Sequence, residues 1–441
     1  MNTPICDFVR EYEKKNALRL HMPGHKGKGD VEKYDITEIE GADVLYNAKG
    51  IIKQSEDNAS SLFGTAKTLY STEGSSLCIR AMLYLAKLWG KKPLIAAGRN
   101  AHKAFMSAAA LCDFEVDWLC GERTGVISCR ITAEFLEEYL SKNKPVAVYI
   151  TSPDYLGNIS PIEELAKVCH KHGVLLLVDN AHGAYLQFLK KSAHPIALGA
   201  DICCDSAHKT LPVLTGGAYL HISKNTDKML REQAENAMAL FASTSPSYLI
   251  LQSLDAANKY LENYDGKLDA FAKYVFSLKE KLTKNGYTLV GEELLKITLA
   301  PKSYGYTGDE IAKLLEKQGI ICEFSDPDYT VMMLTPEIEE RALLHLEKVL
   351  CGIPKREEIT KIPPGHHKCE KVFSTREALF SQSEEKPVSL CIGRVLADAV
   401  VSCPPAIPIV VCGERVDEAA VKLFEYYGIT TCRVVKEKNI F

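Results

Sequence analysis

Between residues 67 and 178 the sequence alternates short strand-like segments with longer amphipathic ones. The strand-like segments lie at residues 67–72, 93–97, 115–119, 145–150 and 174–178, and 93–97, 145–150 and 174–178 among them are almost wholly apolar. The amphipathic segments are typical of helices and lie at residues 77–89, 104–111 and 132–140, with a further helix opening at Ser160. Because parallel strands need long, usually helical, crossovers, this alternation predicts an α/β fold with a mostly parallel sheet and helices on both faces. Ligands of such sheets bind at the carboxyl ends of the strands.

A lysine follows a further apolar segment. Residues 206–212 read Ser-Ala-His-Lys-Thr-Leu-Pro, and they lie between an apolar segment at 202–204 and a predicted strand at 216–222. This order places Lys209 on a turn inside the core. Burial disfavours the ammonium form and lowers the pKa of a lysine, so Lys209 is a candidate for a Schiff base with an aldehyde. The alternative is a surface lysine whose aliphatic stem packs beside the strand.

Gly74, Ser75 and Ser76 stand between the first predicted strand and its helix. A turn of this kind at a helix start presents backbone N–H groups, two hydroxyls and the positive end of the helix dipole, which together suit a phosphate group. The alternative is an ordinary serine N-cap that serves only the helix.

Two further polar side chains follow predicted strands. Asp179 comes directly after the uniformly apolar segment 174–178, where a carboxylate is costly unless a cation or a donor pairs with it. His102 lies on the loop after the strand at 93–97. Asp179 could instead cap the next segment, and His102 could be a hydrogen-bonded structural histidine.

Charge and composition narrow the class of protein. The formal net charge of −4 supplies no basic footprint for nucleic acid. The first residues lack the pattern of a signal peptide, and no run of about 18 apolar residues occurs. We therefore expect a cytoplasmic protein without membrane contact, whose 15 cysteines are free thiols. His21 and His25 have no carboxylate or cysteine at ligand spacing, so we assign no metal site.

At 441 residues the chain exceeds one ordinary domain. We expect a largely irregular N-terminal arm and a large domain, followed by a small α+β domain with strands that include residues 320–324, a linker rich in proline and charge, and a C-terminal module. The proposed boundaries are 1–60, 61–265, 266–353, 354–368 and 369–441.

Taken together, the Gly-Ser-Ser turn, His102, Asp179 and Lys209 occur in the order of pyridoxal phosphate (PLP) enzymes with the aspartate aminotransferase-like fold. More closely, the chain resembles the Orn/Lys/Arg decarboxylase family, in the short form without a receiver-like N-terminal domain. The stretches that carry this resemblance are residues 21–27, 36–38, 62–64, 73–76, 99–103, 151–153, 178–183, 206–209, 243–248 and 404–408. The resemblance implies a seven-stranded sheet of the PLP-dependent transferase type and smaller α+β domains after it.

The resemblance also implies roles for individual residues. Lys209 would hold the cofactor as a Schiff base, Asp179 would pair with the pyridine nitrogen, and His102 would stack on the ring. His208 would contact the phosphate or the substrate carboxylate and help to deliver a proton. The remaining implied cofactor-binding residues are Gly74, Ser75, Ser76, His182, Ser206, Thr244 and Ser245. In this family the active site forms at a dimer interface, so Thr244 and Ser245 would complete the site of a neighbouring subunit.

The predicted function is PLP-dependent α-decarboxylation of arginine, lysine or ornithine to the corresponding amine, in polyamine metabolism and by a homodimer or higher homo-oligomer. Two alternatives stay open: an aminotransferase with the same cofactor, and a PLP-binding protein that lost turnover and serves a regulatory role. The family pattern is altered at Cys403, Ala406, Cys412 and Val44. Glu414 could approach a basic substrate, although a surface carboxylate is the simpler interpretation. Residues that bind the distal group of the substrate are not assigned.

Overall fold

The structure is a computed structural model, and it describes residues 1–90, 93–121, 126–365, 369–399 and 406–437. The chain forms two compact units. Unit 1 consists of Met1–Lys92, Val146–Val148 and Ile162–Leu268, and unit 2 consists of Pro93–Pro145, Tyr149–Pro161 and Asp269–Phe441.

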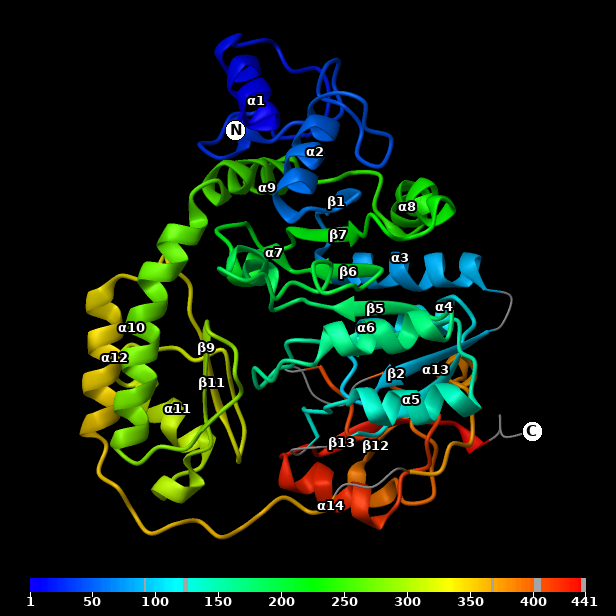
Figure 1. Cartoon of the computed structure of the whole chain (residues 1–441), viewed down its shortest axis with the longest axis vertical. Coiled ribbons are helices and arrows are strands. Elements are labelled where there is room, and N and C mark those ends of the chain that lie inside the picture. The colour runs from blue at the N-terminus through cyan, green and yellow to red at the C-terminus, as the bar shows by residue number, and fades with distance from the viewer. Residues whose placement is uncertain (91–92, 122–125, 366–368, 400–405, 438–441) are drawn as a thin grey trace. The chain divides into compact units, whose positions relative to one another are not determined.

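The main sheet has seven strands in the order β1-β7-β6-β5-β4-β2-β3 (Figure 1). Its strands are β1 (Lys67–Ser71), β2 (Leu94–Gly98), β3 (Glu115–Leu119), β4 (Ala147–Thr151), β5 (Leu175–Asp179), β6 (Ile202–Asp205) and β7 (Ala218–Ile222). β5 and β6 are parallel, as are β2 and β3, whereas β7 runs antiparallel to both β6 and β1. With helices around this sheet, the predicted α/β class is confirmed. The strands lie within a residue or two of the segments that the apolar pattern predicted.

The helices of unit 1 lie before, between and after its strands β1, β5, β6 and β7 along the chain. They are α1 (Pro4–Lys14), η1 (Glu32–Tyr34), α2 (Ile51–Phe63), α3 (Gly74–Trp89), α6 (Ile162–Lys171), η2 (Ala184–Phe188), α7 (Ala207–Thr210), α8 (Lys228–Phe241) and α9 (Tyr248–Leu261). The expectation that the first sixty residues are irregular is wrong for α1 and α2, which are regular helices, whereas residues 15–50 between them contain only the short η1. α1 begins at Pro4, a favourable first helical residue, and buries Ile5, Cys6 and Val9. Its apolar stripe is too short to stand out in the sequence.

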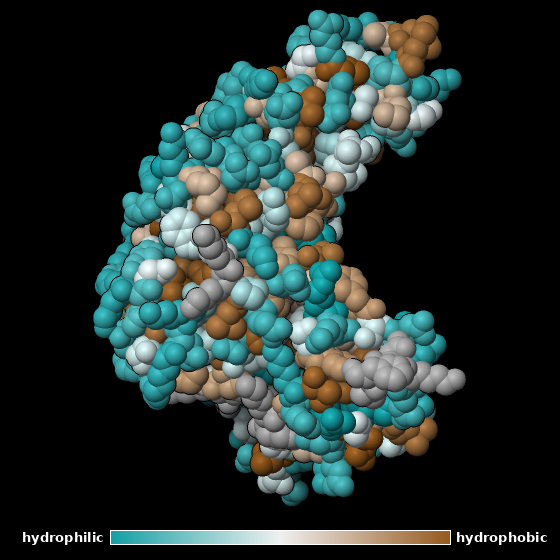
Figure 2. Space-filling view, turned by 90° about the vertical axis from the view of Figure 1, so that its right-hand side faces the viewer, coloured by the Kyte–Doolittle hydropathy of each residue, from teal (hydrophilic) through white to brown (hydrophobic). Residues whose placement is uncertain are grey.

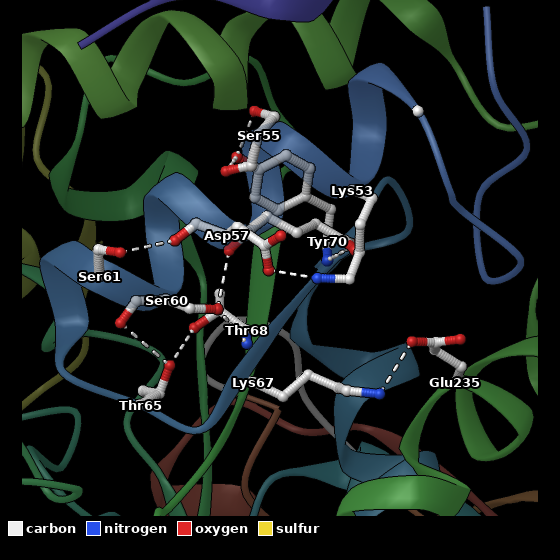
Figure 3. A network of polar contacts seen from close by, with 12 residues as sticks. Lys53, Ser55, Asp57, Ser60, Ser61, Thr65, Lys67, Thr68, Tyr70 and Glu235 are labelled. Atoms are coloured by element: carbon white, nitrogen blue, oxygen red, sulfur yellow. Dashed lines mark hydrogen bonds and ion pairs between the residues drawn. The ribbon is translucent and has the colours of Figure 1, made fainter.

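Polar side chains tie the edge of the unit 1 sheet to its helices (Figure 3). The Ser55 hydroxyl on α2 lies 2.7 Å from the Tyr70 hydroxyl on β1, and Asn258 on α9 donates to the same Tyr70 oxygen at 2.8 Å. The Lys67 ammonium on β1 lies 2.9 Å from the Glu235 carboxylate on α8. These contacts connect segments that are up to 188 residues apart in the chain.

Unit 2 adds two antiparallel sheets. The first has the order β10-β11-β9-β8 and the second pairs β12 with β13. These strands are β8 (Leu289–Val290), β9 (Lys296–Leu299), β10 (Phe324–Ser325), β11 (Thr330–Met333), β12 (Ser383–Pro387) and β13 (Thr431–Val435). The helices are α4 (Lys103–Leu111), α5 (Ala133–Lys142), most of α10 (Tyr264–Lys284), η3 (Pro301–Tyr304), α11 (Gly308–Glu316), α12 (Glu340–Gly352), α13 (Thr375–Phe380), η4 (Val388–Leu390) and α14 (Glu418–Tyr426).

The four-stranded sheet and its helices match the predicted α+β character of the region after residue 265. Helices α10 and α12 lie side by side (Figure 1), and the Lys281 ammonium on α10 is 3.0 Å from the Glu347 carboxylate on α12. The strand expected at residues 320–324 is largely wrong, because β10 begins only at Phe324. Ile321 is 77% exposed, so part of that apolar run does not enter the core.

The face in Figure 2 is mostly hydrophilic, with apolar residues scattered among polar ones. None of the helices in the described part of the chain is long and apolar enough to cross a membrane.

Candidate functional site

The start of α3 has the geometry of an anion-binding helix terminus. Gly74 is its first residue and has φ +70°, a conformation that L side chains rarely adopt, and a Cβ added there would meet no atom within 4 Å. Glu73 is the N-cap, and its side chain makes no capping hydrogen bond. The serine N-cap considered for this turn is therefore not what the structure has. Ser75 and Ser76 lie in the first turn, where N–H groups lack intrahelical acceptors.

Two other segments of unit 1 reach this helix start. The Ser206 hydroxyl donates to the Ser75 hydroxyl at 2.8 Å, which joins the lysine-bearing turn to α3. The backbone N–H of Ser243 donates to the Glu73 carboxylate at 2.7 Å. Thr244 and Ser245 follow on the loop between α8 and α9, and both are exposed. Hydroxyl groups and backbone amides from three segments thus gather near one helix terminus.

Lys209 lies on α7, the short helix directly after β6. Its Nζ is 3.0 Å from Nε2 of the buried His182, so an ammonium at this position donates to the imidazole. The ring of His208 is oriented by the Gly217 carbonyl, which lies 3.0 Å from Nδ1. A proton on Nδ1 satisfies that contact, and proton exchange with another group is then left to Nε2.

Asp179 is the last residue of β5 and is 2% exposed. One of its oxygens, Oδ1, accepts the backbone N–H of Ala181 at 3.2 Å and lies 3.7 Å from the Cys204 sulfur on β6. A carboxylate is therefore placed at the carboxyl end of an inner strand, one strand away from the turn that carries Lys209. This is where an α/β sheet presents groups to a ligand.

His102 belongs to unit 2, where it is the N-cap of α4. Its Nδ1 accepts the backbone N–H of Ala104 at 3.2 Å. The loop is also held by the C-terminal module, since the N–H of Lys103 donates to the Ala406 carbonyl at 3.0 Å. The structural alternative for His102, a hydrogen-bonded structural histidine, is thus realised. Cys403, Pro404 and Pro405, part of the motif quoted above, lie outside the described residues.

The expectation that Glu414 is a surface carboxylate is wrong. Glu414 is buried, and its Oε2 lies 2.6 Å from Nη2 of Arg99, which is fully buried directly after β2. The guanidinium also lies over the Trp118 ring, 5.5 Å from its centroid. The partners are 315 residues apart, which is why neither sequence position indicated the other.

A second group of buried side chains was not predicted. His194, Asp205 and His221 are all fully buried in unit 1, and both imidazoles contact the same carboxylate oxygen. Only the position of Asp205, directly after a buried strand and directly before Ser206, could have drawn attention to it. Asp179 has the same kind of position on β5.

These groups fit pyridoxal phosphate. The first turn of α3 with Ser75 and Ser206 offers phosphate donors, Asp179 offers a buried carboxylate for a protonated ring nitrogen, and Lys209 offers a primary amine. The open space beside Gly74 leaves room for the phosphate. An α/β sheet of this topology with this donor set defines the class of PLP enzymes with the aminotransferase-like fold.

Comparisons with known proteins agree with this class. The family model described as Orn/Lys/Arg decarboxylase, major domain, matches residues 3–285. An arginine decarboxylase of Bacillus subtilis is 28% identical, over 94% of this chain and 91% of that protein. The lysine decarboxylase LdcF of Francisella novicida has a similar structure, with a TM-score of 0.79, 16% identity and coverage of 98% of this chain and 81% of that one. A structure of SPT with PLP, 13% identical, gives a TM-score of 0.57 over 79% of this chain and 82% of that one.

The chain therefore belongs to the Orn/Lys/Arg decarboxylase family, and it is an enzyme of the PLP-dependent amino acid decarboxylase class. Its fold and family imply PLP as the cofactor. The predicted domain boundaries and the roles of the individual residues stay predictions.

Proposed function

We propose that this enzyme removes the α-carboxylate of arginine, with lysine and ornithine as the other candidate substrates, and so supplies an amine to polyamine metabolism. The observation that carries the proposal is the Lys209 amine 3.0 Å from His182, on the turn whose Ser206 contacts the start of α3. Arginine stands first because relatives that match more than nine tenths of this chain are named arginine decarboxylases. When bound, PLP would act as the electron sink for the carbanion left by loss of carbon dioxide.

Lys209 and Asp179 would fix the two ends of the cofactor ring. Nζ of Lys209 would hold the cofactor through its aldehyde carbon, and His182 Nε2, 3.0 Å from that nitrogen, would accept a proton from the amine. The carboxylate of Asp179 would receive a hydrogen bond from the ring nitrogen and keep it protonated. Burial of Asp179 strengthens this interaction, because water does not compete for the carboxylate.

The phosphate would bind at the first turn of α3. Gly74, Ser75 and Ser76 would donate backbone N–H groups, and the hydroxyls of Ser75 and Ser206 would donate as well. The contact between these two hydroxyls already holds them together at 2.8 Å.

The remaining predicted residues would act on the ring face and the substrate. His208, oriented through Nδ1, would deliver a proton from Nε2 to the substrate carbon after decarboxylation. His102 would stack on the ring. Thr244 and Ser245, both exposed, would complete the site of a second subunit.

We also propose a cytoplasmic homodimer. Leu18, Leu20 and Met22 are 84, 83 and 66% exposed in the N-terminal segment, and burying such side chains against a second copy would stabilise the pair. Sedimentation velocity at several protein concentrations tests this assembly. A monomer at all concentrations would contradict it.

The function is tested with purified protein, PLP and each of the three basic amino acids. We expect release of carbon dioxide and of the matching amine, fastest with arginine. Adding a keto acid as amino-group acceptor distinguishes an aminotransferase from a decarboxylase. Formation of a new amino acid without release of carbon dioxide would contradict decarboxylation. Bound PLP without turnover of any of the three substrates would favour the regulatory alternative.

A further inference from the structure

Asp205 is a fully buried carboxylate that the proposed chemistry does not use. It ends β6 and immediately precedes Ser206. Three side chains donate to it: Asn180 Nδ2 contacts Oδ1 at 2.6 Å, while Nε2 of His194 and of His221 contact Oδ2 at 3.0 and 3.1 Å. Both oxygens therefore have donors without any water or ion.

Asn180 connects Asp205 to the neighbouring strand end. It directly follows Asp179, and its backbone N–H donates to the Cys204 carbonyl on β6 at 2.9 Å. The side-chain bond from Asn180 to Asp205 is a second connection between the same two strand ends. Since Asp179 and Ser206 flank this bridge on either side, it constrains their separation together with the pairing of β5 and β6.

On its other side Asp205 is connected to β7 and β1. His221 lies on β7, and its Nδ1 is 2.9 Å from the hydroxyl of Thr68 on β1, which in turn is 2.8 Å from the hydroxyl of Thr65. The order of the strands is β1-β7-β6-β5, so one row of polar contacts crosses four neighbouring strands of unit 1. The row ends at Asn180, beside Asp179.

Hydrogen bonds from His194 and His221 are enough to stabilise the buried charge of Asp205, without a metal ion. Burial by itself would raise the pKa of Asp205, but the charges and hydrogen bonds of His194 and His221 outweigh burial, so the pKa lies below its ordinary value. Burial lowers the pKa of His221, and the charge and hydrogen bond of Asp205 oppose this shift. The three groups could in principle hold a metal ion, but the nitrogen–oxygen distances are hydrogen-bond lengths and Asn180 already occupies the other oxygen.

We propose that Asp205 is a positioning residue that, through Asn180, holds Asp179 at a set distance from Ser206. This distance would let Asp179 reach the ring nitrogen of PLP while Ser206 contacts its phosphate. This inference rests on the proposed binding of PLP to Lys209. A rigid strand-end bridge raises cofactor affinity because binding then requires no rearrangement of the two loops.

The test compares two buried asparagines of unit 1. Asn180→Leu removes the bridge and keeps Asp205 with its two histidines, whereas Asn258→Leu removes a contact to Tyr70 and leaves the bridge intact. We expect Asn180→Leu to raise the PLP dissociation constant about tenfold, the value of one hydrogen bond to a charged group. It should also shift the pH at which the visible absorbance of the bound cofactor changes.

Asn258→Leu should lower the melting temperature of the cofactor-free protein without changing either property. A third variant, Asp205→Asn, removes the charge and should weaken PLP binding at least as much as Asn180→Leu. If Asp205→Asn does not fold, Asn180→Leu alone still decides.

Three results would overturn the proposal. The first is a lower melting temperature of Asn180→Leu with an unchanged dissociation constant and an unchanged pH profile, as for Asn258→Leu. The second is one equivalent of tightly bound metal in the purified protein that is lost in Asp205→Asn. The third is absence of PLP binding in the unaltered protein, which would remove the proposed function as well; the first two leave that function intact.

Discussion

The carboxyl ends of β6 and β2 both carry a buried charged side chain, but the two charges are stabilised differently. Asp205, the last residue of β6, receives three side-chain donors over its two oxygens. Arg99, after β2, has one carboxylate partner, Glu414, and its Nε and Nη1 have no hydrogen-bond partner among the described residues. Each charge lies close in sequence to a proposed cofactor residue, Ser206 in one case and His102 in the other.

The number of partners decides whether the loss of one partner mainly changes local geometry or mainly lowers the stability of the fold. A charge with several fixed donors keeps its stabilisation when one donor is removed, so such a change mainly alters local geometry. A charge with one partner becomes an isolated buried charge when that partner is removed, and this costs folding free energy. Asp205 is thus suited to positioning a site, whereas Glu414 ties the C-terminal module to the folding of the loop that carries His102.

The largest expected effect tests whether the chemistry belongs to the β6 end. Lys209→Ala should lower decarboxylation by a factor of at least about 10³, because the covalent attachment and proton exchange at Nζ are both lost. The visible absorbance of bound cofactor should disappear while the melting temperature changes little. The matched control is Lys228→Ala, an exposed lysine on α8 in the same unit. Wild-type activity in Lys209→Ala would show that another amine reacts with the cofactor, and the end of β6 would then no longer be the site to compare with the end of β2.

The next effect tests the single-partner charge. Glu414→Gln should lower the free energy of unfolding by about 3 to 5 kcal/mol, because Arg99 stays buried and charged. Chemical denaturation followed by fluorescence measures this loss. Glu370→Gln, in the same module, removes an exposed partner of Arg415 and should cost less than about 1 kcal/mol. Equal losses in the two variants would mean that the Arg99 pair is no more important than a surface pair.

Much of this fold follows from local sequence patterns. The strands at 93–97 and 174–178 are predictable because apolar runs bounded by turns reflect burial on both faces of a sheet. The positions of Gly74, Asp179 and Lys209 after such strands could be inferred in the same way. Helix α1 was missed because only Ile5, Cys6 and Val9 form its buried stripe.

Contacts between distant segments could not be predicted from one sequence. His194, Asp205 and His221 come from a loop and two strands, and antiparallel pairing of β7 with β6 is needed to bring them together. Arg99 and Glu414 are 315 residues apart. A charged residue in an apolar context signals a partner, but the identity of that partner depends on tertiary structure.

The buried carboxylate of Glu56 extends the comparison to a charge with too few hydrogen-bond donors. Glu56 on α2 accepts the Tyr70 backbone N–H at 3.0 Å, and burial raises its pKa to about 8 from 4.5. Between pH 5 and 8 the unfolded chain has lost this proton while the folded protein retains it, so the free energy of unfolding falls as pH rises, by roughly 1.4 kcal/mol per unit of pKa shift at most. Glu56→Gln should flatten this decline.

The measurement is the free energy of unfolding at pH 5, 6, 7 and 8 for both proteins. Glu163→Gln on α6 removes an exposed carboxylate and serves as the control, whose slope should match the wild type. A Glu56→Gln slope identical to the wild type would show that burial does not keep this carboxyl protonated.

The smallest effect separates the two roles of His102, the cap of α4 and the proposed stacking partner of the cofactor ring. His102→Asn can still accept the Ala104 N–H as an N-cap, whereas His102→Ala cannot, so Ala should cost about 1 kcal/mol more in stability. Both substitutions remove the aromatic ring and should weaken PLP binding by the same roughly threefold to tenfold factor. Equilibrium binding and thermal unfolding measure the two quantities independently. If His102→Asn has both the PLP affinity and the stability of the wild type, His102 acts only as the N-cap of α4. The end of β2 would then affect PLP binding only by stabilising the fold.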